Sequence, residues 1–157
     1  MLQSKRAKQF QSLLDERGLG LKVVELPESS RSAEEAAHAL GCNQAQIVKS
    51  LVFKNMETDA PLLVLASGTN RVNEEAISGF LGAPIERPDA KYVRAVTGFS
   101  IGGIPPLGHK QEIEIYVDED LLGFDEIWAA AGTPSAVFMM PGNLPDILGT
   151  HRIISVK

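Results

Sequence analysis

The sequence has little of what marks several large protein classes. Its 157 residues contain a single cysteine, Cys42, which excludes an internal disulfide framework and is typical of a reducing compartment. No apolar run approaches the ~20 residues that a membrane-spanning helix needs. Residues 1–18 also lack the uninterrupted apolar segment of a secretory signal. We therefore expect a cytoplasmic protein that does not associate with membranes.

The chain has no excess of basic residues. Its 15 Lys and Arg face 20 Asp and Glu, for a formal net charge of −5, whereas proteins that bind long stretches of nucleic acid usually carry a basic surface. The charge argues against DNA binding but leaves open a protein that holds only a nucleotide end. Local groups of cations are interpreted as solvated faces or as phosphate contacts: Lys5, Arg6, Lys8, Arg87, Lys91, Arg94, Lys110 and Arg152.

Repeats, low-complexity segments and blocks of like charge are absent from the sequence. A composition of 44% hydrophobic and 22% charged residues is that of a globular protein, and a chain of this length buries ~70% of its unfolded surface. We predict one domain over residues 1–157. Because no Ser-His-Asp set, HExxH motif or Cys/His ligand cluster is visible, we predict neither a metal site nor a cofactor.

Strand-like and helix-like patterns alternate along the chain. Strands are predicted at residues 21–26, 47–53, 61–66, 112–118, 126–132, 135–140 and 152–156. Helices are predicted at residues 2–18, 30–41, 72–82, 89–98 and 144–149, with Ser32 and Glu35 in capping-box spacing and Asn73 and Asp89 as N-caps. Most connections are too short for a parallel βαβ repeat. The pattern therefore predicts an α+β domain with a curved, mostly antiparallel sheet, or a partly open barrel, of six to seven strands with flanking helices.

The segment "IVKSLVF", Ile47 to Phe53, contains one residue that is unusually polar for its surroundings. Alternation places Lys49 on the same face as Ile47, Leu51 and Phe53, and the opposite face is mostly apolar too. A strand that is apolar on both faces is expected to be covered on both sides. Lys49 either extends to water at the strand end or is held on an apolar wall for a function.

The segment "TGFSIGGIPPLGH", Thr97 to His109, holds four glycines and two adjacent prolines. Glycine allows close approach of the backbone to a ligand, and proline stiffens the loop. Its free N–H groups would bind an anion or the oxyanion of an acyl-transfer intermediate. The other interpretation is a rigid turn between a helix and a strand. His109, which ends the segment, is a candidate proton carrier or a structural residue.

Together, "IVKSLVF" and "GFSIGGIPPLGH" resemble the YbaK/ProX family of aminoacyl-tRNA deacylases, which are free-standing relatives of the editing domain of bacterial prolyl-tRNA synthetases. The segments "LLVLASGTNRVN", "EIYVDEDL" and "AGTPSAVF" follow in the family's order. The resemblance implies hydrolysis of the ester that joins a wrongly attached amino acid to the terminal adenosine of a tRNA. Lys49 matches the family's functional lysine, and Gly102 to Pro106 match its GxxxP loop. The form "GGIPPLGH" is more similar to the ProX-type branch than to the YbaK branch that clears cysteine.

This resemblance implies a set of roles. We expect the catalytic groups to be Lys49 and the backbone N–H groups of Gly102, Gly103 and Ile104. The expected substrate-binding residues are Ile47, Phe53, Pro105, Pro106 and His109. The expected partner is the acceptor end of an aminoacyl-tRNA, first of all tRNA-Pro carrying alanine or another small amino acid, with prolyl-tRNA synthetase as a further partner. The alternatives are a non-catalytic module that binds aminoacyl-tRNA, a nucleotide or an amino acid, and a hydrolase of small esters.

Overall fold

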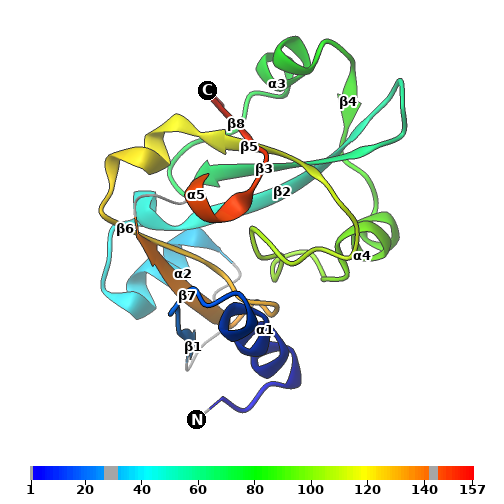
Figure 1. Cartoon of the computed structure of the whole chain (residues 1–157). Coiled ribbons are helices and arrows are strands. Elements are labelled where there is room, and N and C mark those ends of the chain that lie inside the picture. The colour runs from blue at the N-terminus through cyan, green and yellow to red at the C-terminus, as the bar shows by residue number, and fades with distance from the viewer. Residues whose placement is uncertain (1, 27–31, 142–144) are drawn as a thin grey trace.

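The computed structural model describes residues 2–26, 32–141 and 145–157, which form two β-sheets with flanking helices (Figure 1). The strands are β1 (Val23–Glu25), β2 (Val48–Asn55), β3 (Pro61–Ser67), β4 (Ile85–Glu86), β5 (Glu114–Asp118), β6 (Glu126–Ala130), β7 (Ala136–Pro141) and β8 (Arg152–Ile154). One sheet is antiparallel, with the order β1-β7-β6. The other has the order β4-β2-β3-β5-β8; its first three strands are antiparallel, and β5 and β8 run parallel to β3.

The α+β class and the mostly antiparallel pairing are confirmed. The described residues form eight strands, whereas six to seven were predicted. The strand that the sequence did not reveal is β4, which has only two residues, too few for a periodic sequence pattern. The strands are divided between two sheets that do not close into a barrel. An isolated parallel bridge between Ile47 and Trp128 connects the start of β2 with β6. The single domain over residues 1–157 stays a prediction.

Three of the described helices begin directly after the N-caps that the sequence predicts. The helices are α1 (Lys5–Glu16), α2 (Ala33–Leu40), α3 (Glu74–Leu81), α4 (Ala90–Thr97) and α5 (Pro145–Leu148). The side chains of Ser32, Asn73 and Asp89 accept backbone N–H bonds in the first turns of α2, α3 and α4. Residues 30, 31 and 144 of the predicted helices lie outside the described residues. None of the helices in the described ranges has the length and hydropathy needed to cross a bilayer.

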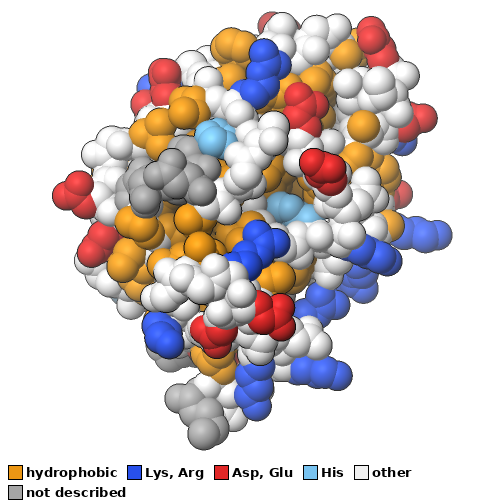
Figure 2. Space-filling model, in the orientation of Figure 1, with side chains coloured by type: hydrophobic (Ala, Val, Ile, Leu, Met, Phe, Trp, Pro, Cys, Tyr) orange, Lys and Arg blue, Asp and Glu red, His pale blue; other side chains and the backbone are white. Residues whose placement is uncertain are grey.

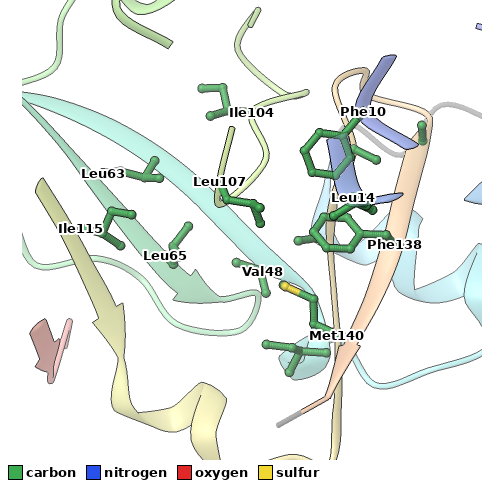
Figure 3. Packing of buried hydrophobic residues seen from close by; sticks show 14 of the residues in the cluster. Phe10, Leu14, Val48, Leu63, Leu65, Ile104, Leu107, Ile115, Phe138 and Met140 are labelled. Carbon is green, nitrogen blue, oxygen red and sulfur yellow. The ribbon is translucent and has the colours of Figure 1, made fainter. Parts of the chain in front are cut away.

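Both faces of β2 are covered, as its sequence predicts. Val48 and Val52 belong to the main core, which lies between the larger sheet, α1 and β7. Figure 3 shows that Ile104 and Leu107, from the segment 97–109, also point into this core. Phe53 packs into a second cluster on the other face of the sheet. The glycine-proline segment is therefore anchored by buried apolar side chains.

Candidate functional site

One edge of β2 is open over most of its length within the described part of the chain. β3 pairs with β2 from Val48 to Lys54, whereas β4 reaches only Lys54 and Asn55, and Trp128 bridges only Ile47. A cavity of about 460 Å³ lies at this open edge, between β2, the segment 97–109, β6 and the N-terminal end of α2. Residues that line it include Ile47, Lys49, Ser50, Gly102, Ile104 and Trp128.

Lys49 is half-buried in the wall of this cavity. Its Nζ donates a hydrogen bond to the main-chain oxygen of Asn70, and the Asn70 amide donates to Asp118 and Asp120, at 2.7 Å each. Burial lowers the pKa of Lys49 below the usual 10.5; the Asp118 carboxylate opposes this shift and Arg87 adds to it. No carboxylate among the described residues forms an ion pair with Lys49, so its positive charge is available to a ligand.

The GxxxP loop, Gly102 to Pro106, is held tightly against the β6–β7 connection. The N–H of Gly103 donates to the carbonyl of Ser100, and the carbonyl of Gly103 accepts the N–H of Gly132, both at 3.0 Å. A Cβ on Gly103 would lie 2.9 Å from the Cα of Thr133, so only glycine fits this approach. The position of the loop is therefore fixed by backbone contacts as well as by Ile104.

Two backbone donors of this loop are uncommitted. Gly102 has a φ of 95°, a conformation that glycine adopts without strain, and it lines the cavity. Among the described residues, the N–H groups of Gly102 and Ile104 donate to no protein acceptor, whereas the N–H of Gly103 is used within the loop. Two N–H groups of the loop, instead of the expected three, are therefore without a protein acceptor, and their role in binding an anion beside Lys49 stays a prediction.

The structure places the sequence-predicted site residues in four groups. Ile47, Lys49, Gly102 and Ile104 line the cavity of about 460 Å³, and Gly103 is buried behind it. Phe53 lines an adjoining cavity of about 120 Å³, which shares Ser50, Leu51, Ile101 and Ile104 with the larger one. Pro105 and Pro106 are buried, and His109 lines a separate cavity of about 740 Å³. Within the described residues, no group of three or more His, Cys, Asp or Glu side chains is arranged to hold a metal ion.

His109 contacts the GxxxP loop through the backbone carbonyl of Pro105. Its Nε2 lies 2.7 Å from the carbonyl oxygen of Pro105. Burial lowers the pKa of His109 below 6.5; the bond to Pro105 raises the pKa by less, and the charge of Arg17 lowers it further. At neutral pH the ring is therefore uncharged and donates its Nε2 proton to the carbonyl. This contact matches the structural interpretation of His109, and its role in substrate binding stays a prediction.

Two cavity residues were not identified from the sequence. The Ser50 hydroxyl oxygen is buried without a hydrogen-bond partner, the one such side-chain atom in the described ranges. Trp128, the single tryptophan of the chain, is partly exposed and supplies the one aromatic ring in the cavity wall formed by the described residues. A serine that alternates with Val48 and Val52 and a tryptophan in a strand are both ordinary features of a buried sheet. Only the open edge of β2 reveals that both residues line a cavity.

The chain is similar in sequence and in fold to proteins that contain an aminoacyl-tRNA editing domain. A family model of the aminoacyl-tRNA editing domain matches residues 27–147. A crystal structure of a proposed trans-editing enzyme for prolyl-tRNA synthetase is 43% identical, with a TM-score of 0.92 over 99% of each chain. The uncharacterized protein YwhH of Bacillus subtilis is 30% identical over 125 residues, which is 79% of this chain and 79% of YwhH.

The same domain also occurs inside a much larger enzyme. Proline–tRNA ligase of Limosilactobacillus fermentum is 32% identical over 102 residues, which is 60% of this chain but 17% of the ligase. The matches confirm the resemblance seen in "IVKSLVF" and the GxxxP loop. The chain belongs to the aminoacyl-tRNA editing domain family.

Proposed function

We propose that this protein is a trans-editing hydrolase that cleaves the aminoacyl ester of mischarged tRNA, with tRNA-Pro carrying alanine or another small amino acid as its substrate. The observation that carries the proposal is the convergence of Lys49, Gly102 and Ile104 on one cavity, although they lie far apart in the sequence. The family and the relatives associated with prolyl-tRNA synthesis support the reaction class and the tRNA.

The two free backbone N–H groups suit ester hydrolysis. A water molecule, oriented with help from the neighbouring ribose hydroxyl, attacks the acyl carbon. The oxyanion that develops accepts hydrogen bonds from Gly102 and Ile104, and one such donor is commonly worth ~3 kcal/mol of barrier. The bond between the acyl carbon and the ribose oxygen then breaks, that oxygen takes a proton, and the free amino acid leaves. Because an aminoacyl ester is already labile, no strong protein nucleophile is needed.

Lys49 contributes its charge to this reaction. As an ammonium group it has no free lone pair, so it acts electrostatically on the terminal phosphate or on the acyl carbonyl. Its half-buried position strengthens that interaction, since charges interact more strongly where water is partly excluded. The tether to Asn70 holds the amine at the cavity wall and leaves it without a carboxylate partner that would neutralise it.

The smaller cavity is suited to the amino-acid side chain. Its volume is about 120 Å³ and most of its wall is apolar; the lining includes Leu51, Val52, Phe53, Ile101 and Ile104. A small apolar group such as the alanine methyl fits this space. One methylene changes binding in such a pocket by only ~1–3 kcal/mol, so we expect discrimination by size to be graded. Ile47 then acts as part of the wall of the larger of these two cavities, and the buried Pro105 and Pro106 act by stiffening the GxxxP loop.

The test is turnover with a panel of mischarged tRNAs. Catalytic amounts of protein are incubated with Ala-tRNA-Pro and with tRNA-Pro carrying other amino acids, and the free amino acid is measured. We expect release in excess of enzyme, and a loss of about a hundredfold or more in Lys49→Ala, the scale of a removed transition-state contact. Lys54→Ala is the matched control, because Lys54 lies on the same strand but pairs with Asp59 at the surface.

Two results would overturn the proposal. Release of no more than one equivalent would indicate a binding module, and equal rates on simple amino-acid esters would indicate a small-ester hydrolase. A folded Lys49→Ala variant with the wild-type rate would remove Lys49 from the mechanism. The proposal also places the protein in the cytoplasm beside prolyl-tRNA synthetase, and the deacylation rate with and without added synthetase tests that partnership.

A further inference from the structure

A basic surface borders the GxxxP loop of this acidic protein. It consists of five exposed side chains from three segments: Lys5, Arg6, Lys91, Arg94 and Lys110. These are one third of the 15 Lys and Arg in a chain whose net charge is −5. Figure 2 shows Lys and Arg side chains gathered at the lower right of the view, over α4 and α1. The fold thus brings together cations that are distant in the sequence.

Three of these cations lie at the first residues of the segment 97–109, just before the GxxxP loop. Arg6 donates from Nη1 to the carbonyl of Gly98 at 2.6 Å, and Arg94 donates from Nη2 to the hydroxyl of Ser100 at 2.7 Å. Lys110 lies beside the same turn, with its Cβ 3.5 Å from where a Cβ on Gly98 would be. The surface is therefore joined directly to the segment that lines the cavity from Ile101 onward.

The charges of this surface are not neutralised by ion pairs. The ion pairs of the described residues involve Lys54, Arg87 and Lys157, and none of the five basic-surface residues. The first turns of α1 and α4 carry no acidic residue. Clustered like charges repel one another and raise the local concentration of anions. Arg6, Arg94 and Lys110 lie at the turn 98–100, which leads to Ile101 in the wall of the cavity beside Lys49, and Lys110 also lines the separate cavity of about 740 Å³. Cations without ion-pair partners at this place favour a phosphate ligand over a purely solvated face.

We propose that this basic surface binds phosphates of the tRNA acceptor stem while the 3′ end occupies the cavity beside Lys49. The inference rests on the proposed function. An RNA whose last nucleotide lies in the cavity has to leave it past exposed groups, and Ile101 and Gly102, which are exposed and line the cavity, directly follow the turn held by Arg6 and Arg94. The net charge alone predicts that the protein contacts only the terminal nucleotide of the tRNA. The local positive charge of the basic surface extends the predicted contacts to the acceptor stem.

The test separates contacts with the stem from chemistry at the ester. The triple variant Lys5→Gln/Lys91→Gln/Lys110→Gln removes three charges and keeps Arg6 and Arg94, which hold the loop. We expect KM for aminoacyl-tRNA to rise about tenfold or more, and the slope of log KM against log salt to become shallower by about 2 to 3, at ~0.7–0.9 per lost phosphate contact. Hydrolysis of an aminoacylated CCA trinucleotide, which has no stem, should be unchanged, and kcat should stay within about twofold because the reacting groups are untouched.

The matched control is Lys22→Gln/Lys54→Gln/Arg152→Gln. It removes the same net charge from sites outside the basic surface and should change neither KM nor the salt slope. Wild-type KM and slope in the test variant would overturn the inference, while turnover by the wild type would leave the proposed function standing. Binding of an acceptor-stem minihelix that carries no amino acid provides a readout independent of hydrolysis. This binding should weaken in the test variant alone, even if the proposed function fails.

Discussion

Lys49 and Asp118 are linked through a single residue, Asn70, whose carbonyl accepts from the lysine and whose amide donates to the carboxylate. Asp118 is fully buried and also accepts the N–H of Ser67 at 2.9 Å. The carboxylate therefore stabilises the ammonium charge from a distance. Because Asn70 stands between the two groups, the lysine keeps its charge available to a ligand while its position is fixed.

Removing the Asp118 charge should lower the pKa of Lys49 further. Burial already holds the pKa below 10.5, and the carboxylate raises it. In Asp118→Asn the ammonium deprotonates at lower pH, so an activity that needs the charged lysine declines earlier as pH rises. NMR of ¹³C-methylated lysines, with Lys49→Arg for assignment, measures the pKa, and the pH–rate profile measures the consequence. Asp120→Asn is the control, since Asp120 also accepts from Asn70 but is only half-buried, pairs with Lys157 and does not contribute to the pKa shift of Lys49. An unchanged pKa in Asp118→Asn would contradict this account.

Alanine should be poorly tolerated at Gly103. The new Cβ would lie 2.9–3.0 Å from backbone atoms of Thr133, and such overpacking typically costs ~1–3 kcal/mol of the free energy of unfolding. Gly79→Ala is the control, because this glycine lies in α3 with no atom near the new Cβ and should gain ~0.5–1 kcal/mol. Urea denaturation measures both. Equal stability of Gly103→Ala and wild type would show that the loop can move away from the β6–β7 connection.

The features that could be predicted from the sequence depend on short-range signals. Ser32, Asn73 and Asp89 cap helices because a short polar side chain and the next three N–H groups are close in the chain. The alternation in "EIEIYVD" correctly predicts that Ile113, Ile115 and Val117 lie together, and all three are in the main core. The local patterns singled out Lys49 and the glycine-proline segment but left two interpretations of each open, and only the family resemblance favoured a function.

The features that could not be predicted depend on long-range pairing. The cavity exists because β2 has an open edge, and that edge is visible only once Trp128 is known to bridge Ile47 and β4 to pair with the end of β2. The contact of Gly103 with Thr133 and the effect of Asp118 on Lys49 likewise join residues 30 or more positions apart. Periodicity carries no information on such contacts, since it reports only which face a residue occupies.

His109 should make the protein sensitive to acid. Its folded-state pKa lies below the ordinary value of 6.5, so the unfolded chain binds the proton more readily than the folded protein. The stability that depends on the neutral ring is complete above pH 6.5 and is lost as pH falls below that value toward the folded-state pKa. Thermal unfolding between pH 7.5 and 5 should show a smaller decline in His109→Gln than in wild type. The exposed His38, replaced by Gln, is the control, and equal declines in wild type and His109→Gln would count against the buried neutral imidazole.

We expect Ser50→Ala to weaken substrate binding without lowering the free energy of unfolding. The Ser50 hydroxyl oxygen is buried and has no partner among the described residues, and the residue lines both the cavity of about 460 Å³ and the cavity of about 120 Å³. Ser50→Ala should therefore leave the free energy of unfolding unchanged or slightly higher. The equivalent change at Ser67, whose hydroxyl donates to Ala45 at 2.6 Å, should cost ~1 kcal/mol or more. If the Ser50 hydroxyl bonds the aminoacyl group, the same substitution should raise KM about two- to tenfold, the scale of one neutral hydrogen bond. Urea denaturation and steady-state kinetics on both variants decide the matter: a destabilised Ser50→Ala with wild-type KM would show that this oxygen serves the fold and leaves the substrate untouched.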